Sequence, residues 1–310
     1  MAGRDSRADI LADDPFRNQK PRVHRVHARQ SQDGTIHFDT GSSTRVNPLF
    51  AQMMGVSKQQ PAQMHKGKIW HFSDEEKKHL RLATAAFTVA LGFMAVGGIW
   101  GIKSLGPTLW VIQLLLSMPV LLLAVGPAFL LHEIGHKIVA KKNGCWAEFR
   151  ADPGGLRFGI FLSFFIGILF MAPGAVMVAG LVTRRQNGHI AIAGPLVNFG
   201  LFLIGIPLWG IILGLTGAFD AAMPGAGYIL GGQLIWQNML IDAGVYWIGA
   251  NLILGLFNML PFGPLDGNKV KDWNENAFYI TISVFALLVI TMFLGTWSPT
   301  TVLKSIASLF

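Results

Sequence analysis

Two histidines and a glutamate stand close together in the segment His132-Glu-Ile-Gly-His136. On a helix, residues four positions apart are neighbours on one face, so both imidazoles can reach one metal ion. A glutamate next to the first histidine can take a proton from a water molecule that attacks a carbonyl carbon. The segment therefore predicts zinc-dependent hydrolysis, with His132 and His136 as metal ligands and Glu133 as the general base.

A catalytic zinc site takes three protein ligands and leaves the fourth position to water or substrate. Asp266 is the candidate third ligand, near the end of the run Asn258–Gly267. It lies five residues before Lys271, and His136 lies five residues before Lys141. Five residues of helix span roughly 7 Å, so both side chains would lie at a similar depth, that far deeper in the membrane than their flanking lysines. We therefore expect Asp266 to complete the site, with Zn²⁺ as the cofactor.

The elements that must position these residues are membrane helices. The chain has 310 residues, of which 52% are hydrophobic and only 14% are charged, and its mean hydropathy is +0.46. A soluble protein of this length carries more charge, and several apolar runs reach the roughly 20 residues that cross a bilayer as a helix. We expect an all-α polytopic membrane protein with about five to six transmembrane helices and a short re-entrant or strand-like element.

Five apolar segments are expected to cross the bilayer, and a capping box formed by Ser73 and Glu76 is expected to open the first. These segments are Leu80–Ile102, Leu109–Ala140, Ile190–Leu215, Val245–Val270 and Ala277–Leu294. A Gly-rich loop is expected over residues 217–242. Residues 156–182 are also apolar, but Pro173, Gly174 and Gly180 interrupt them. They would form either one kinked span or a re-entrant hairpin or strand pair.

Positive charge gives the predicted orientation. Lys and Arg collect at residues 1–81, 137–185 and 269–271 and are nearly absent at 103–108 and 217–242. The positive-inside rule places the first group in the cytoplasm. The active site is then expected nearer the cytoplasmic face of the cell membrane, and residues 156–182 must start and end on one side, which favours the re-entrant reading.

The three motifs together resemble those of the site-2 protease family of intramembrane zinc metalloproteases. His132–His136 and Asn258–Gly267 resemble its two zinc motifs, and Ala193-Gly-Pro-Leu-Val-Asn198 resembles the segment between them. Pro173–Val176 resembles the strand-like element before that segment. The likeness covers about residues 72–295 and follows an archaeal-type plan, without a PDZ or C-terminal regulatory domain. It implies an intramembrane zinc endopeptidase that cleaves in or near transmembrane helices of other membrane proteins, in regulated intramembrane proteolysis.

Two polar residues inside the expected spans are candidates for substrate binding. The resemblance implies that Asn198 and Asn258 hold the substrate backbone or polarise its carbonyl, as an amide donor can. Asparagines in membrane bundles also form hydrogen bonds between helices. Both interpretations are open for Asn198 and Asn258, whereas Asn251 is expected to be structural. Pro173–Val176 would either pair with an unwound substrate as an added strand or form a packing kink.

The N-terminal part differs from the rest. Residues 1–81 hold 14 of the 25 Lys and Arg, and the stretch Arg22–His37 shows weak alternation. A basic segment before a first span suits an anionic membrane surface, so the lipid bilayer is an expected partner and nucleic acid is not. We expect residues 1–70 to be a partly disordered cytoplasmic extension and residues 71–310 to be a membrane-embedded metalloprotease domain. The single cysteine, Cys145, excludes an intrachain disulfide.

Other classes of protein fit less well. A prenyl-protein endoprotease also carries the HExxH pattern in a span, but it takes a Glu from a later helix. The only later glutamates here, Glu148 and Glu275, lie in polar segments. A metal transporter would need several intramembrane ligand sets, and a non-catalytic relative would usually lack Glu133. No pattern indicates the substrate, the cleavage site or the oligomeric state.

Overall fold

The computed structural model describes residues 27–30, 36–39, 70–171, 173–179, 182–224, 227–263 and 265–310. Contacts divide the chain into two units, residues 1–64 and 65–310. In the first unit, β1 (His27–Gln30) pairs antiparallel with β2 (Ile36–Asp39). Apart from these strands and Trp70, residues 1–70 lie outside the described residues, and their predicted disorder stays a prediction.

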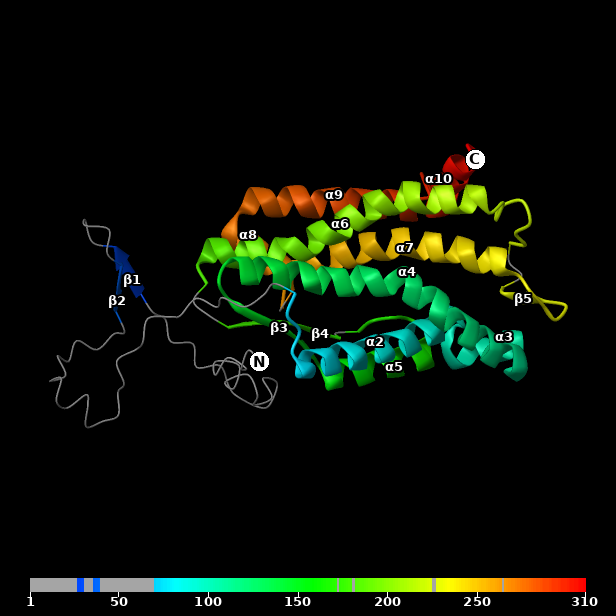
Figure 1. Ribbon diagram of the computed structural model, residues 1–310, viewed down its shortest axis with the longest axis horizontal. Coiled ribbons are helices and arrows are strands. Elements are labelled where there is room, and N and C mark those ends of the chain that lie inside the picture. Colours follow the sequence, from blue (N-terminus) through cyan, green and yellow to red (C-terminus); the bar gives the residue numbers. More distant parts are fainter. Residues whose placement is uncertain are drawn as a thin grey trace. The chain divides into compact units, whose positions relative to one another are not determined.

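The second unit is helical (Figure 1). Its helices are α2 (Asp74–Ala95), η2 (Gly98–Trp100), α3 (Gly101–Leu105), α4 (Pro107–Lys142), α5 (Pro153–Ile166), α6 (Arg184–Leu215), α7 (Trp236–Asn258), α8 (Asp266–Trp273), α9 (Glu275–Phe293) and α10 (Pro299–Ala307). Within the described residues, α4, α6, α7 and α9 are long and apolar enough to cross a membrane. The pair of α2 and Gly98–Leu105, bent by 44°, would make a fifth span. The all-α polytopic fold is therefore confirmed, with four or five spans.

Helix α4 lies at the centre of the second unit and contacts α2, α6 and α7 (Figure 1). Its approach to α6 depends on Gly135, the fourth residue of the predicted metal motif. A Cβ atom at Gly135 would lie 2.9 Å from Val197 Cγ2 and 3.2 Å from the Ala193 carbonyl oxygen. Because glycine has no side chain, this turn of α4 packs directly on the predicted middle motif, Ala193–Asn198.

A two-stranded antiparallel sheet lies beside α4. It pairs β3 (Trp146–Ala151) with β4 (Gly174–Ala179), and Phe149 stands opposite Val176. Helix α5, between the two strands, packs against α2. Residues 156–182 therefore hold most of a short helix and one strand, so the reading as one kinked span is wrong. The expected strand-like element is present, but the strand pair does not lie within this segment: the partner strand, β3, lies before it, in a polar stretch that was not expected to form a strand.

The expected span Val245–Val270 is shifted in the structure. Helix α7 begins at Trp236, so the predicted loop 217–242 is shorter than expected, and its residues Ile229–Leu230 (β5) and Gln233–Leu234 (β6) form a small hairpin. Helix α7 ends at Asn258. Pro261 lacks an N–H, and Gly263 has a φ of +60°, so the chain cannot continue as a helix there. A new helix, α8, begins at Asp266.

The predicted capping box at the start of α2 is only half formed. Ser73 Oγ accepts the Glu76 backbone N–H at 3.1 Å, as expected. The Glu76 side chain does not return to the Ser73 amide. It is fully buried and bonds instead to Lys137 on α4 and to the Phe149 backbone N–H on β3. The reason is tertiary: a buried ammonium group competes successfully for the carboxylate.

Candidate metal centre

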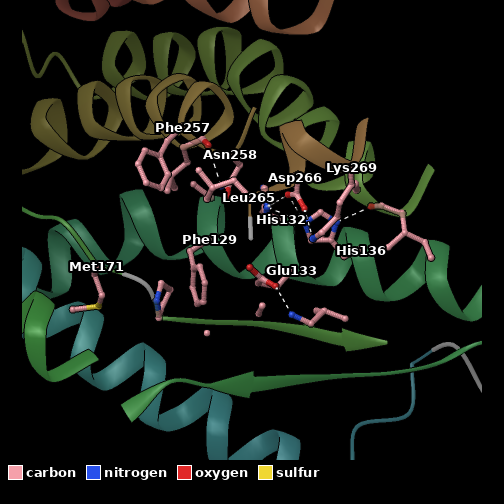
Figure 2. A pocket seen from close by; sticks show the side chains of 18 of the residues that line it. Phe129, His132, Glu133, His136, Met171, Phe257, Asn258, Leu265, Asp266 and Lys269 are labelled. Carbon is pink, nitrogen blue, oxygen red and sulfur yellow. Dashed lines mark hydrogen bonds and ion pairs between the residues drawn. The ribbon is translucent and has the colours of Figure 1, made fainter. Parts of the chain in front are cut away.

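His132, His136 and Asp266 are buried and meet at one point (Figure 2). The two Nε2 atoms lie 3.0 Å apart. Asp266 Oδ2 lies 3.4 Å from His132 Nε2 and 3.0 Å from His136 Nε2. Two imidazoles and one carboxylate are a donor set used by catalytic zinc sites, where a fourth position stays open. The structure thus brings together the three predicted ligands in a group that could hold a metal ion.

The outer nitrogen of each imidazole has a hydrogen-bond partner on α6. His132 Nδ1 lies 2.6 Å from Asn198 Oδ1, and His136 Nδ1 lies 2.7 Å from the Ile190 carbonyl oxygen. A carbonyl oxygen can only accept, so His136 Nδ1 carries the proton, and the same assignment holds for His132 opposite the amide oxygen. Both Nε2 lone pairs are then free to bind a metal.

The orientation of Asn198 follows from its other contacts. Its Nδ2 group donates to the Ala128 carbonyl oxygen at 2.9 Å and to Asn251 Oδ1 at 3.0 Å. Both amide hydrogens are therefore used, and the oxygen must face His132. Asn198 is fully buried behind the metal centre. Asn251, expected to be structural, links α7 to this network.

Gly194 leaves the space between the two imidazoles open. A Cβ atom at this position would lie 2.5 Å from Nε2 of both His132 and His136. An alanine methyl group would therefore take the place that a shared ligand of the two nitrogens needs. This contact explains physically why glycine stands in the predicted middle motif, directly before Pro195.

Asp266 is the first residue of α8, and its burial depends on the glycine that follows. A Cβ atom at Gly267 would collide with the Met259 carbonyl oxygen, so only glycine allows this close return of the chain. The Asp266 carboxylate thereby faces the two imidazoles, with Oδ2 3.0 Å from His136 Nε2 and 3.4 Å from His132 Nε2. A carboxylate oxygen is a ligand that suits Zn²⁺.

Lys269 was not identified from the sequence, although it stands three residues after Asp266 on the same short helix. Its Nζ lies 3.4 Å from Asp266 Oδ1. This contact leaves Oδ2 to face the histidines, as Figure 2 shows. The i,i+3 spacing within a helix was the signal that could have indicated it.

Glu133 and Asn258 line a cavity of about 380 Å³ beside the three predicted ligands. Glu133 Oε2 accepts the Val176 backbone N–H at 3.1 Å, so the predicted base contacts β4 (Figure 2). Asn258 Nδ2 donates to the Leu254 carbonyl oxygen at 3.1 Å. Much of the remaining wall is aromatic or aliphatic, and includes Phe87, Phe129, Phe170, Met171, Phe257 and Phe262. The cavity thus combines an acid–base group with apolar walls.

About half of the chain aligns with curated relatives. A protein of Methanocaldococcus jannaschii provisionally named zinc metalloprotease MJ0611 is 39% identical over 154 residues, which are 49% of this chain and 69% of that protein. A Bacillus subtilis protein provisionally named zinc metalloprotease YwhC is 30% identical over 163 residues, 50% of this chain and 68% of that protein. The chain belongs to this zinc metalloprotease family.

A further member, zinc metalloprotease MJ0392 of Methanocaldococcus jannaschii, is 30% identical over 151 residues, 49% of this chain and 33% of that protein. No family model and no solved structure matches the chain. Membership in the zinc metalloprotease family agrees with the resemblance seen in the motifs and makes Zn²⁺ the cofactor. The chemistry of the His132, His136 and Asp266 donors and the space left by Gly194 fit that ion.

Proposed function

We propose that this zinc metalloprotease is an intramembrane endopeptidase of the site-2 type, which cleaves peptide bonds in or near transmembrane helices of other membrane proteins. One observation carries the proposal. The three predicted ligands and Glu133 converge at a buried point on α4 and α8, beside helices long enough to cross a membrane. A hydrolytic site at this place would meet its substrates within the bilayer.

We propose that His132, His136 and Asp266 hold the zinc ion and that Glu133 is the general base. When bound, zinc supplies a Lewis acid that acidifies water and polarises the scissile carbonyl. Glu133 takes the proton of the attacking water on its carboxylate and passes it to the leaving amine. Asn198 keeps His132 in the required tautomer through Nδ1, and its engaged amide favours this indirect role over direct substrate binding.

The open edge of β4 is the proposed docking place for an unwound substrate segment. Phe149 and Val176 are opposite each other, and the Val176 N–H points away from β3, toward Glu133. In an antiparallel pair this direction alternates, so the N–H groups of Gly174 and Val178 point toward the same edge. All three residues line the cavity. A substrate strand added here would pass beside the metal centre, and Asn258 could hold its backbone.

The protein is a multi-pass membrane protein by the number of its apolar helices. We propose that its N-terminus is cytoplasmic and that the active site lies nearer the cytoplasmic face. The support is the charge pattern: Lys141 and Lys142 follow the metal motif on α4, and Lys269 and Lys271 follow Asp266 on α8. Membrane proteins that contain a transmembrane helix are the proposed substrates.

The proposed activity is tested with the Glu133→Gln variant. Removing a general base lowers the rate by about 10²- to 10⁴-fold, while the zinc ligands stay in place. Membrane proteomes of cells that express the wild-type or the variant protein should therefore differ, with uncut substrates enriched in the variant. Metal analysis should give equal zinc in both proteins and less zinc in Asp266→Ala. Identical proteomes would reject the protease, and undiminished zinc in Asp266→Ala would reject that ligand.

A further inference from the structure

A buried ion pair joins α2 to α4 at the sheet, one helical turn beyond the metal motif's Glu133. The Lys137 ammonium group binds Glu76 Oε2, and the two side chains are only 2% and 1% exposed. The Phe72 ring covers the ammonium group, with its centroid 3.5 Å from Nζ. Burying two charges costs about as much free energy as their attraction returns, so such a pair is weak evidence for stability. Its contacts indicate a different role.

Helix α2 binds the outer edge of β3 through two side chains. Glu76 Oε1 accepts the Phe149 backbone N–H at 3.1 Å, and His79 Nδ1 accepts the Ala151 N–H at 3.2 Å. Glu76 and His79 are three residues apart, as are neighbours on one face of a helix. The edge of β3 that does not pair with β4 is thus fixed by side chains from a transmembrane-length segment.

The opposite edge of the sheet is held at the same place. Phe149 stands opposite Val176, whose N–H binds the predicted base Glu133. The contacts therefore form a closed circuit from Glu133 through Val176, Phe149 and Glu76 to Lys137, which returns to α4 one turn after Glu133. A two-stranded sheet is only marginally stable by itself, so its position along α4 depends on such contacts.

We propose that Glu76, neutralised by Lys137, is a positioning residue that fixes where the β3–β4 sheet lies along α4, relative to the metal centre. Because the substrate strand is proposed to pair with β4, this position of the sheet determines which peptide bond lies beside Glu133. The proposal rests on the proposed intramembrane protease function. A misplacement of about 1 Å can cost on the order of 100-fold in rate, so a small shift of the sheet would be visible in cleavage.

Two double variants separate the anchor from the buried charge. Glu76→Gln with Lys137→Met removes both charges but keeps an oxygen acceptor for the Phe149 N–H. Glu76→Ala with Lys137→Met also removes both charges but leaves that N–H without its partner. Neither variant leaves one charge of the Glu76–Lys137 pair buried without the other, which is the change that would prevent folding. Lys77→Met is the matched control, since Lys77 forms an ion pair with Asp74 on α2 but is 56% exposed.

Hydrogen exchange of the full chain in lipid nanodiscs gives a readout that needs no activity. In the Ala double variant, residues 146–151 and 174–179 should exchange roughly tenfold faster than in the wild type. The Gln double variant and Lys77→Met should keep wild-type protection there. Equal protection of the sheet in both double variants would overturn the proposed anchor, whatever the protein's activity.

Cleavage of a substrate recovered with the Glu133→Gln variant gives the second readout. The Ala double variant should cut at several neighbouring bonds, with kcat lowered roughly 10- to 100-fold and zinc content unchanged. The Gln double variant should cut at the wild-type bond. A merely destabilised enzyme would cut that same bond more slowly, and this result in the Ala variant would overturn the role in bond selection. Absence of cleavage by the wild type would instead reject the proposed protease function. The hydrogen-exchange result would still test whether Glu76 anchors the sheet.

Discussion

At the scale of single residues, a glycine determines whether the two imidazoles have room for a metal ion. We expect Gly194→Ala to lose zinc, because the new methyl group would lie 2.5 Å from both Nε2 atoms. Gly200→Ala on the same helix is the control: apart from its chain neighbours and the backbone of its own helix turns, no atom lies within 4 Å of its Cβ position, and it should stabilise the helix by up to about 1 kcal/mol.

Zinc per chain and thermal unfolding of the two purified variants check this prediction. Gly200→Ala should bind wild-type amounts of zinc and unfold at the same or a higher temperature. Gly194→Ala should bind little zinc although alanine is the better helix former. A full zinc complement in Gly194→Ala would mean that the metal does not lie between His132 and His136.

The convergence of His132, His136 and Asp266 could be predicted because two patterns in the sequence indicate it. The four-residue spacing is a property of one helix, and the matching distances to Lys141 and Lys271 indicate depth. The partners of these residues could not be predicted in the same way. Asn198 is 66 positions from His132, and Glu76 is 61 positions from Lys137. Only the folded chain shows which polar groups meet over such distances.

At the scale of elements, the N–H groups along the open edge of β4 are proposed to bind substrate. We expect Val178→Pro to raise KM, because proline removes one N–H that faces the cavity rather than β3. One lost hydrogen bond is worth about 0.5–1.5 kcal/mol, or roughly two- to tenfold in KM.

Val178→Ala is the matched control for this change, since it shortens the side chain but keeps the N–H. Steady-state cleavage kinetics and zinc analysis of both variants test this prediction. Both should contain wild-type zinc, and only the proline variant should bind substrate more weakly. Equal KM values for the two variants would contradict strand addition at this edge.

The long apolar helices were predictable, whereas their ends and the sheet were not. Leu80–Ile102 was expected to be one helix, but Gly97 and Gly98 adopt φ values of +70° and +60°, and the chain bends there. Strand β3 contains Glu148 and Arg150, so its composition indicated a polar loop. These two side chains form their own buried ion pair at 2.5 Å. A strand is defined by a partner distant in sequence, and here that partner is β4.

At the scale of the whole molecule, the metal centre and the β5–β6 hairpin lie toward opposite ends of the helix bundle. Helix α4 begins beside α3 and ends near α8, and β5 lies at the end away from α8 (Figure 1). The metal motif stands in the last turns of α4, where basic residues gather, and residues 217–242 contain no Lys or Arg. The positive-inside rule therefore predicts opposite sides of the membrane for these two ends.

Cysteine labelling in intact cells checks this orientation. The native Cys145 is only 1% exposed and should not react, so single cysteines can be added to the natural sequence. Gln233→Cys in β6 and Lys142→Cys at the end of α4 both fall at exposed positions. A maleimide that cannot cross membranes should label Gln233→Cys in intact cells, and Lys142→Cys only after lysis. Labelling of Lys142→Cys in intact cells would place the metal centre nearer the outer face, and the cytoplasmic orientation would then be wrong.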